Sequence, residues 1–317
     1  MSDQYGGQPK ADAPNLQLIR ATARNTKATN ESSLPFTASP ADLWDEGPTT
    51  PMPTKPLRKP SNLKLQVVAP SPLSVGRTDI RGNAVYSRIL LSIPDDEYKA
   101  LLPHLEFIDL SLHQSLHESP DGLEYGYFLN LGLTSLVIET EDGRSVEVGI
   151  VGREGFVGVP LAAGMNLTPY RACVQAKGNG FRIKAEVLEV TLSLTPNLRL
   201  RLNQYAQSQG MQVAQLAACN RLHEIDQRLA RWLLMCQDRI GSDLLPMTHE
   251  FFAQMLGTGR PSVSLAAAVL QRAGFIQYAR GTVKIIDRKG LERAACECYA
   301  VIQKFDGNAS TSPNLRS

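Results

Sequence analysis

The side chains best suited to metal or redox chemistry are five cysteines and five histidines in a chain of 317 residues. The cysteines are Cys173, Cys219, Cys236, Cys296 and Cys298. Only the last two are close in sequence, and one Cys-x-Cys pair lacks the second pair of ligands that a zinc site needs. We therefore interpret them as half-buried thiols on a terminal helix and expect no metal. An odd, scattered set without a signal peptide predicts reduced cytosolic thiols and no resident cofactor.

The sequence contains few residues in the patterns that enzymes use for catalysis. His113 and His117 would lie about 13 Å apart on one face of a strand, so we expect surface histidines rather than a haem or metal site. Glu154, beside Arg153 in a glycine-rich turn, is a single carboxylate without a partner. The GxSxG, P-loop, HExxH and dinucleotide-binding fingerprints are all missing. We therefore expect a binding protein and not an enzyme.

The most specific pattern lies in residues 247–290. Thr248 can cap a short helix, and Gly257 breaks it. Pro261 then occupies the first turn of a second helix, which Gly274 closes. Two strands follow around an Arg-Gly turn. Two short helices joined by a glycine-containing turn, then a hairpin, are typical of a winged helix-turn-helix, whose second helix enters the major groove by its N-terminal end.

Side chains that can contact DNA lie on this predicted domain. Arg260 can donate two hydrogen bonds to a guanine edge, and the hydroxyls suit phosphates or bases. Seven basic and four acidic residues give 245–300 a net charge of +3, whereas the whole chain has only +2. DNA binding is therefore predicted from where the basic residues lie and not from the net charge of the chain. The candidate DNA-binding residues are Thr248, His249, Thr258, Arg260, Ser262, Ser264, Arg272, Arg280 and Lys284.

Two further kinds of element would position this domain. Alternating apolar residues on both sides of Asp142-Gly143 predict a β-hairpin, and further strands at 172–175 and 180–184 indicate a small β-barrel or sandwich. After Thr195, a hydroxyl cap followed by proline, apolar residues recur at helical spacing for more than 20 residues. Such a long amphipathic helix needs a partner, either its own domain or the same helix of a second chain.

The amino-acid composition also limits what structure the rest of the chain can form. Eleven of the 20 prolines fall in the first 80 residues, which predicts a disordered tail. No window has 18 consecutive apolar residues, so we expect no membrane span. The predicted α+β organisation is a tail at 1–80, a β-barrel at 81–194, a long helix at 195–221, a winged helix-turn-helix domain at 222–300 and a flexible C-terminus at 301–317.

Four segments together resemble the Crp/Fnr family of bacterial transcription regulators. They are GIVGREGFVG at 149–158, TPYRACVQA at 168–176, HEIDQRLARWLL at 223–234 and the long run MTHEFFAQ…CECY at 247–299. The resemblance implies a jelly-roll, cyclic-nucleotide-binding-like barrel that acts as a sensor, then a dimerisation helix, then a winged helix-turn-helix. It also implies double-stranded DNA, a second copy of the chain and RNA polymerase as partners, in the cytoplasm.

This sequence departs from the family pattern at the positions that would hold an effector. Cyclic-AMP-binding members have Gly-Glu and Arg-Ser pairs, whereas here Val159 follows Gly158 and Ala172 follows Arg171. Gly158, Arg171 and Ala172 are thus the candidate positions for an unknown small-molecule effector, and cyclic AMP is not expected. On the second helix, Pro261 and Leu265 stand where well-known members have an acidic residue and a second arginine.

Two hypotheses about DNA binding follow. The first is a homodimeric, sequence-specific transcription regulator whose barrel senses an unknown signal. The alternative is a constitutive, low-specificity DNA-binding protein whose barrel serves dimerisation only. The ratio of affinities for selected and random DNA distinguishes them.

Overall fold

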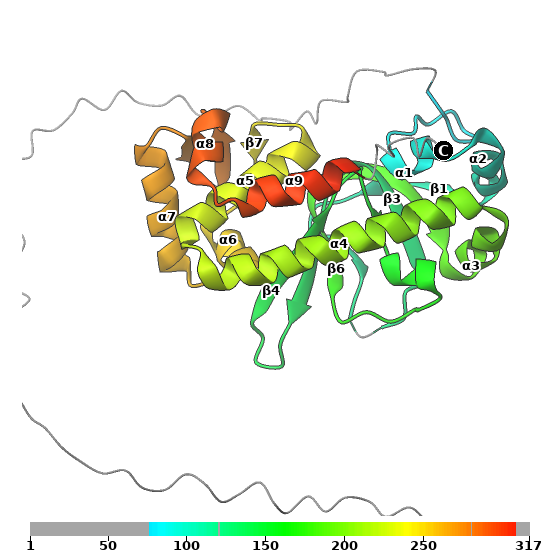
Figure 1. The fold of residues 1–317 in the computed structure, drawn as a ribbon, viewed down its shortest axis with the longest axis horizontal. Helices are drawn as coiled ribbons and strands as arrows, with labels where there is room; N and C mark the ends of the chain where they lie inside the picture. Colours follow the sequence, from blue (N-terminus) through cyan, green and yellow to red (C-terminus); the bar gives the residue numbers. More distant parts are fainter. Residues whose placement is uncertain (1–75, 120, 280, 309–317) are drawn as a thin grey trace, which may run out of the picture. The chain divides into compact units, whose positions relative to one another are not determined.

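The computed structural model describes residues 76–119, 121–279 and 281–308 (Figure 1). The predicted tail at 1–80 lies outside the described residues except for 76–80. The order of elements, a β-rich part, a long helix and a C-terminal helix-turn-helix with a wing, agrees with the predicted α+β fold.

The β-rich part begins with two short helices and contains one six-stranded antiparallel sheet. The sheet has the order β1-β6-β3-β4, with β2 added to β6 and β5 added to β3. The helices are α1 (Arg88–Ser92), α2 (Asp95–Leu101), the 3-10 turns η1 (Leu102–His104) and η2 (Val159–Ala163), and α3 (Ala185–Leu194). The strands are β1 (Glu106–Leu110), β2 (Ser115–His117), β3 (Tyr125–Glu139), β4 (Ser145–Val151), β5 (Phe156–Val157) and β6 (Arg171–Lys184).

The predicted hairpin at Asp142-Gly143 is confirmed, since β3 and β4 pair from Glu139 opposite Ser145 onward. The two strands predicted at 172–175 and 180–184 are instead one strand, β6. Gly178 explains this continuity, because its α-carbon lies so close to the neighbouring strand that an added Cβ would be 1.9 Å from the Leu131 carbonyl oxygen. Glycine here lets two long strands bend together without a break.

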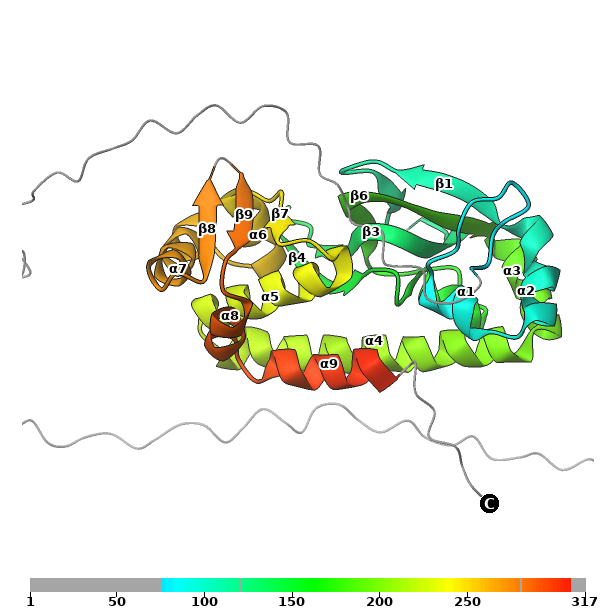
Figure 2. The same cartoon turned by 90° about the horizontal axis from the view of Figure 1, so that it is seen from above.

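The long helix is α4 (Pro196–Leu222), and Figure 2 shows it passing beneath the β-rich part and alongside α9 (Cys298–Asn308). Its start at Thr195-Pro196 was predicted, but the cap is different. Thr195 donates its hydroxyl to Thr191, and the Glu97 carboxylate accepts from the backbone amides of Asn197 and Leu198 at 2.9 and 2.8 Å. An acidic side chain from α2 thus satisfies the amides at the positive end of α4.

The C-terminal part contains α5 (Ile225–Ile240), α6 (His249–Leu256), α7 (Arg260–Arg272) and α8 (Arg288–Ala294). A three-stranded sheet has the order β7-β9-β8, formed by β7 (Leu244–Leu245), β8 (Ile276–Ala279) and β9 (Thr282–Ile285). Its apolar core also contains Leu133, Val137 and Ile150 of the large sheet. The two parts of the chain therefore share one continuous packed interior.

The long helix buries its apolar stripe against its own chain. Leu198, Leu202 and Tyr205 belong to the core of the β-rich part, and Leu216 belongs to the C-terminal core. The buried residues of this stripe therefore pack against the chain's own domains.

Two further expectations need correction. Residues 301–308, expected in a flexible C-terminus, continue helix α9, because Ile302 is buried in the core and Asp306 pairs with Arg239. His117 is buried rather than on the surface, with Nε2 3.2 Å from the Tyr170 carbonyl oxygen. Among the described helices, none is both long and apolar enough to cross a membrane.

Candidate nucleic-acid interface

The helix-turn-helix forms where the sequence predicts it. The Thr248 hydroxyl accepts from the Phe251 amide at 3.2 Å and caps α6, as expected. Gly257 ends α6 in the left-handed conformation with φ at 59°, which glycine adopts without strain. The Thr258 amide then bonds to the Ala253 carbonyl at 3.0 Å, so the turn into α7 is tight.

Helix α7 packs into the domain by a narrow face of small side chains. Val263, Ala266, Ala267 and Leu270 are buried against the core that surrounds Trp232 of α5. The alanines permit close approach of the neighbouring helices, which fixes the orientation of α7. Its remaining surface is free to face a ligand.

The outward face of α7 is partly basic and partly apolar. The Arg260 side chain is 69% exposed, and its one ion pair among the described residues is with Glu250 at 3.9 Å. Leu265 is 71% exposed and Val269 is 41% exposed, while Arg272 is exposed at the far end of the helix. This face can therefore offer a guanidinium for hydrogen bonding and aliphatic groups for apolar contacts.

Two predicted contact residues are turned toward each other instead of outward. His249 Nδ1 lies 3.1 Å from Ser264 Oγ, whose hydroxyl also donates to the Arg260 carbonyl at 3.0 Å. The His249 ring stacks on Tyr278 with ring centroids 4.0 Å apart. Burial, followed by the charge of Arg260, holds the pKa of His249 below its ordinary value. His249 therefore supplies no positive charge to this surface at neutral pH.

The wing lies beside the start of α6. Lys284 on β9 is exposed, and the methyl group of Thr248 lies 3.4 Å from where a Cβ of Gly281 would be. Thr258 and Ser262 are half-buried at the start of α7. Arg280 lies outside the described residues.

A groove of about 1020 Å³ separates the start of α7 from the hairpin of β3 and β4. Gln254 Nε2 of α6 donates to Ser145 Oγ of the hairpin at 2.7 Å. Thr258, Gly259 and Arg260 line one wall, and Thr140, Arg144 and Val146 line the other. The hairpin therefore touches the reading end of the DNA-binding domain without covering Arg260.

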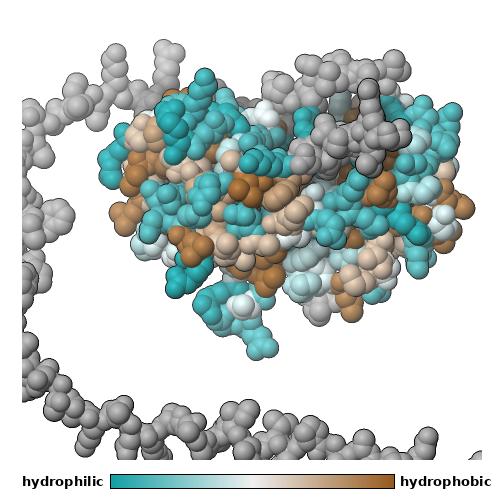
Figure 3. All heavy atoms as spheres, in the orientation of Figure 1, coloured by the Kyte–Doolittle hydropathy of each residue, from teal (hydrophilic) through white to brown (hydrophobic). Residues whose placement is uncertain are grey.

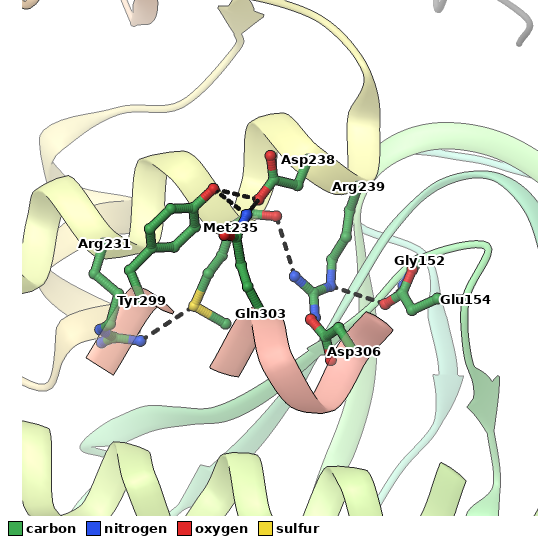
Figure 4. Close-up of polar contacts among 9 residues, drawn as sticks. All are labelled: Gly152, Glu154, Arg231, Met235, Asp238, Arg239, Tyr299, Gln303 and Asp306. Carbon is green, nitrogen blue, oxygen red and sulfur yellow. Dashed lines mark hydrogen bonds and ion pairs between the residues drawn. The ribbon is translucent and has the colours of Figure 1, made fainter. Parts of the chain in front are cut away.

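A buried ion-pair network joins the β-rich part to the C-terminal part (Figure 4). Arg239 of α5 donates to Glu154 Oε1 and Asp306 Oδ2, both at 2.8 Å, and to the Met235 carbonyl at 3.2 Å. Its side chain is only 5% exposed. Glu154, which the sequence left without a partner, is thus half of a structural ion pair between two parts of the chain.

A second buried carboxylate lies at the same junction. Glu147 of β4 accepts from Trp232 Nε1 at 2.6 Å and from Ser135 Oγ at 2.5 Å. Burial raises the pKa of Glu147 from 4.5 to about 7, although both donors and two nearby arginines oppose the shift. No local sequence pattern predicts this contact, because Glu147 and Trp232 are 85 residues apart.

The candidate effector positions line neither of the two clefts described for this chain. Gly158 is in the left-handed conformation before η2, and Ala172 is fully buried. The Arg171 Nε lies 3.6 Å from Glu139 Oε2 on the neighbouring strand. A separate cleft of about 680 Å³ in the β-rich part is lined by other residues, among them Tyr125, Met165 and Lys184.

Comparisons with known proteins agree with this architecture. Residues 227–294 match the family model of the Crp-like helix-turn-helix domain. The chain resembles the solved structure of a putative Crp/Fnr-family regulator from Eubacterium rectale, with TM-score 0.52, 18% identity, and coverage of 66% of this chain and 98% of that chain. It resembles FixK2 from Bradyrhizobium japonicum with TM-score 0.53 and 14% identity over 61% of this chain and 98% of that chain.

A CRP-family transcriptional regulator from Thermus thermophilus gives a TM-score of 0.50 and 23% identity over 59% of this chain and 96% of that chain. A search of curated proteins finds no match to the chain. The solved structures share the fold, and the family model identifies the DNA-binding domain. The resemblance to the Crp/Fnr family is therefore confirmed: residues 227–294 match the Crp-like helix-turn-helix domain, and the chain shares the fold of solved Crp/Fnr-family structures.

Proposed function

We propose that two copies of this chain bind double-stranded DNA sequence-specifically and so regulate transcription in the cytoplasm. The observation that carries the proposal is the exposed Arg260 side chain at the first position of α7. In a winged helix-turn-helix this end of the second helix enters the major groove. Arg260 would then bond to a guanine edge, while Thr258, Ser262, Arg272, Arg280 and Lys284 would contact bases or phosphates.

The surface of α4 supports a homodimer. Seven exposed residues of α4 follow one another at alternating steps of three and four residues, which is the spacing of a coiled-coil seam. The series is Leu200, Asn203, Gln207, Gly210, Ala214, Ala217 and Arg221. Nothing lies within 4 Å of a Cβ built on Gly210, so small side chains would let a second α4 approach closely. Figure 3 shows apolar residues on the face of the molecule that α4 crosses in Figure 1. Met211 of α4 is 41% exposed.

The β-rich part would sense a signal other than cyclic AMP. Arg171 pairs with Glu139, and Ala172 is buried between its neighbours in the sheet. An effector would act through the junction of Glu147, Glu154 and Arg239, because these residues join the sheet to α5. RNA polymerase is the further partner that a transcription regulator requires.

Arg260→Ala tests the proposal. The full-length protein is used to select DNA from a random pool, and affinity for the selected and for random DNA is then measured at several salt concentrations. Arg260→Ala should weaken binding to selected DNA by about 1–3 kcal/mol, roughly 5- to 150-fold, and reduce the preference for it. Lys177→Ala, at an exposed position of the β-rich part, is the control and should leave affinity unchanged.

Two results would contradict the proposal. Affinity that is indifferent to Arg260→Ala and to salt would mean that α7 does not meet DNA. A ratio of affinities near one for selected and random DNA would favour the constitutive, low-specificity binder instead.

A further inference from the structure

Four potential metal ligands converge where the long helix meets the end of the DNA-binding part. Cys219 lies in the last turn of α4, and His223 follows the end of that helix. Cys296 lies between α8 and α9, and Cys298 begins α9. One ligand atom from each of the four lies within 4.8 Å of the others. Cys296 and Cys298 have no second pair of ligands nearby in the sequence. Cys219 and His223, at the C-terminal end of α4, supply that pair from 77 and 75 residues earlier in the chain.

The three thiols are not ordinary members of an apolar core. Cys219, Cys296 and Cys298 are at most 4% exposed, and they form a buried cluster of their own that contains no other apolar residue. Cys236 is different, since it packs among leucines and aromatic residues in the C-terminal core. A free cysteine behaves as a small hydrophobic residue, but three thiols packed on one another and on an imidazole fit a ligand set better.

The distances match a tetrahedral zinc site. Zinc bonds of about 2.3 Å to sulfur and 2.0–2.1 Å to nitrogen place tetrahedral ligands about 3.8 Å apart for two sulfurs and about 3.5 Å apart for sulfur and nitrogen. Cys298 Sγ lies 3.5 Å from His223 Nδ1, and Cys219 Sγ lies 3.4 Å from Cys296 Sγ. Small side-chain adjustments would complete the tetrahedron.

Neighbouring side chains hold the ligands as they do in known zinc sites. His223 Nε2 lies 3.1 Å from Glu297 Oε1, which leaves Nδ1 directed toward the thiols. A ligand histidine commonly donates its other ring nitrogen to a carboxylate, which fixes the ring. Gln215 Nε2 also donates to Cys298 Sγ at 3.1 Å.

A buried cation balances the charge of such a site. Zinc with three thiolates and a neutral histidine has a net charge of −1. Arg231 of α5 is 2% exposed, and its Nε has no hydrogen-bond partner. Its guanidinium interacts electrostatically with Cys219 and Cys296, and Figure 4 shows it beside Met235, to whose sulfur it donates at 3.4 Å. Among the described residues it has no ion pair with a carboxylate.

We propose that Cys219, His223, Cys296 and Cys298 bind one zinc ion. All four coordination positions belong to the protein, so the site is structural and not catalytic. It ties the C-terminal end of α4 to the segment between α8 and α9. The metal would thereby fix the DNA-binding part against the long helix, independently of any DNA sequence or effector.

The metal content of the full-length protein tests this proposal. The protein is expressed with zinc, purified under reducing conditions without chelator, and analysed by plasma mass spectrometry. We expect one zinc per chain. Cys219→Ser and Cys298→Ser should lose it, whereas Cys173→Ser and Cys236→Ser, at buried cysteines outside the cluster, should retain it. His223→Cys should retain the metal and His223→Leu should lose it.

A second measurement does not depend on ligand variants that fold. The wild-type protein is stripped of metal and titrated with Co²⁺, which should produce thiolate-to-cobalt charge-transfer bands and the visible bands of tetrahedral cobalt. Glu297→Gln should keep the stoichiometry but weaken zinc affinity about 10- to 100-fold. Three results would overturn the proposal: five free thiols without metal, a Cys219–Cys296 disulfide without metal, or zinc retained in both serine variants.

Discussion

Leu265 is one of the two positions on α7, with Pro261, at which this chain departs from the family pattern. An aliphatic side chain that is 71% exposed on a DNA-reading helix cannot donate a hydrogen bond, but it can contact the methyl group of thymine. The apolar contact would then specify a base next to the one that Arg260 selects. Val269, on the same exposed stripe, extends this apolar surface along the helix.

Replacing thymine by deoxyuridine in the selected DNA tests this role, because only the methyl group is removed. We expect the wild-type protein to bind more weakly by about 0.8 kcal/mol, roughly fourfold, when the contacted thymine is replaced. Leu265→Ala should bind both DNA molecules with similar affinity. Electrophoretic or fluorescence titration at fixed salt measures the four affinities. A wild-type protein indifferent to replacement of every thymine in the site would contradict the prediction.

At the scale of elements, features that depend on residues close together in sequence could be predicted, whereas contacts between residues far apart in sequence could not. The hairpin at Asp142-Gly143, the Thr248 cap and the two wing strands each depend on residues within one turn or strand of each other. The cap of α4 could not be predicted, because Glu97 lies 100 residues from Asn197. Proximity of this kind is set by tertiary packing and leaves no local pattern in the sequence.

The candidate sites follow the same rule. Arg260 can be proposed from the sequence because helix, turn and wing follow one another along the chain. Ser264 was expected to face DNA, but its position could not be judged without knowing that His249 lies 15 residues away and within 3.1 Å. The Cys219 and Cys296 pair was missed because 77 residues separate two thiols that touch in space.

The contact between β4 and α5 makes stability depend on pH. The folded state raises the pKa of Glu147 from 4.5 to about 7, so the folded protein keeps a proton that the unfolded chain releases. The contribution of Glu147 is therefore most favourable below pH 4.5 and is lost as pH rises through 7, with a slope of up to about 1.4 kcal/mol per pH unit. Glu147→Gln should remove this dependence.

Chemical denaturation at pH 5.5 and at pH 8 measures the effect as the difference between wild type and variant. Relative to Glu147→Gln, the wild-type protein should lose stability between the two pH values. Glu141→Gln, at an exposed position of the same hairpin, should follow the wild-type curve. Parallel curves for wild type and Glu147→Gln would mean that Glu147 does not titrate in this range.

Helix α4 is the element on which the proposed dimer depends. Ala214 and Ala217 are exposed, and a long cation at either position would face its own copy across a two-fold seam. Ala214→Arg should therefore weaken dimerisation about tenfold or more through like-charge repulsion and loss of close packing. Sedimentation velocity over a range of concentrations measures it. Val190→Arg, on the exposed face of α3, should leave the dimer intact, and an unchanged dimer in Ala214→Arg would place the interface elsewhere.

At the scale of the whole molecule, Arg239 links three segments that are distant in sequence. It joins Glu154 of the turn before β5 to Asp306 of α9, and α5 carries it. Burial raises the pKa of Asp306, and Arg239 opposes that shift. Removing the guanidinium would leave two partly buried carboxylates without their shared cation. Breaking a buried ion pair usually lowers the free energy of unfolding by more than the intact pair contributes to it.

We therefore expect Arg239→Met to destabilise the folded protein by about 3–5 kcal/mol at pH 8. The loss should be smaller at pH 5, because the Asp306 carboxyl, whose pKa is raised by burial, can then take up a proton and no longer needs the cation. Arg239→Met combined with Glu154→Gln should recover part of the stability at pH 8, since one of the two uncompensated charges is gone. Urea denaturation of the full chain measures all three, with Arg199→Met as the exposed control. An equal loss at both pH values would show that Arg239 acts through packing alone, and a wild-type stability in Arg239→Met would show that this junction does not hold the two parts of the chain together.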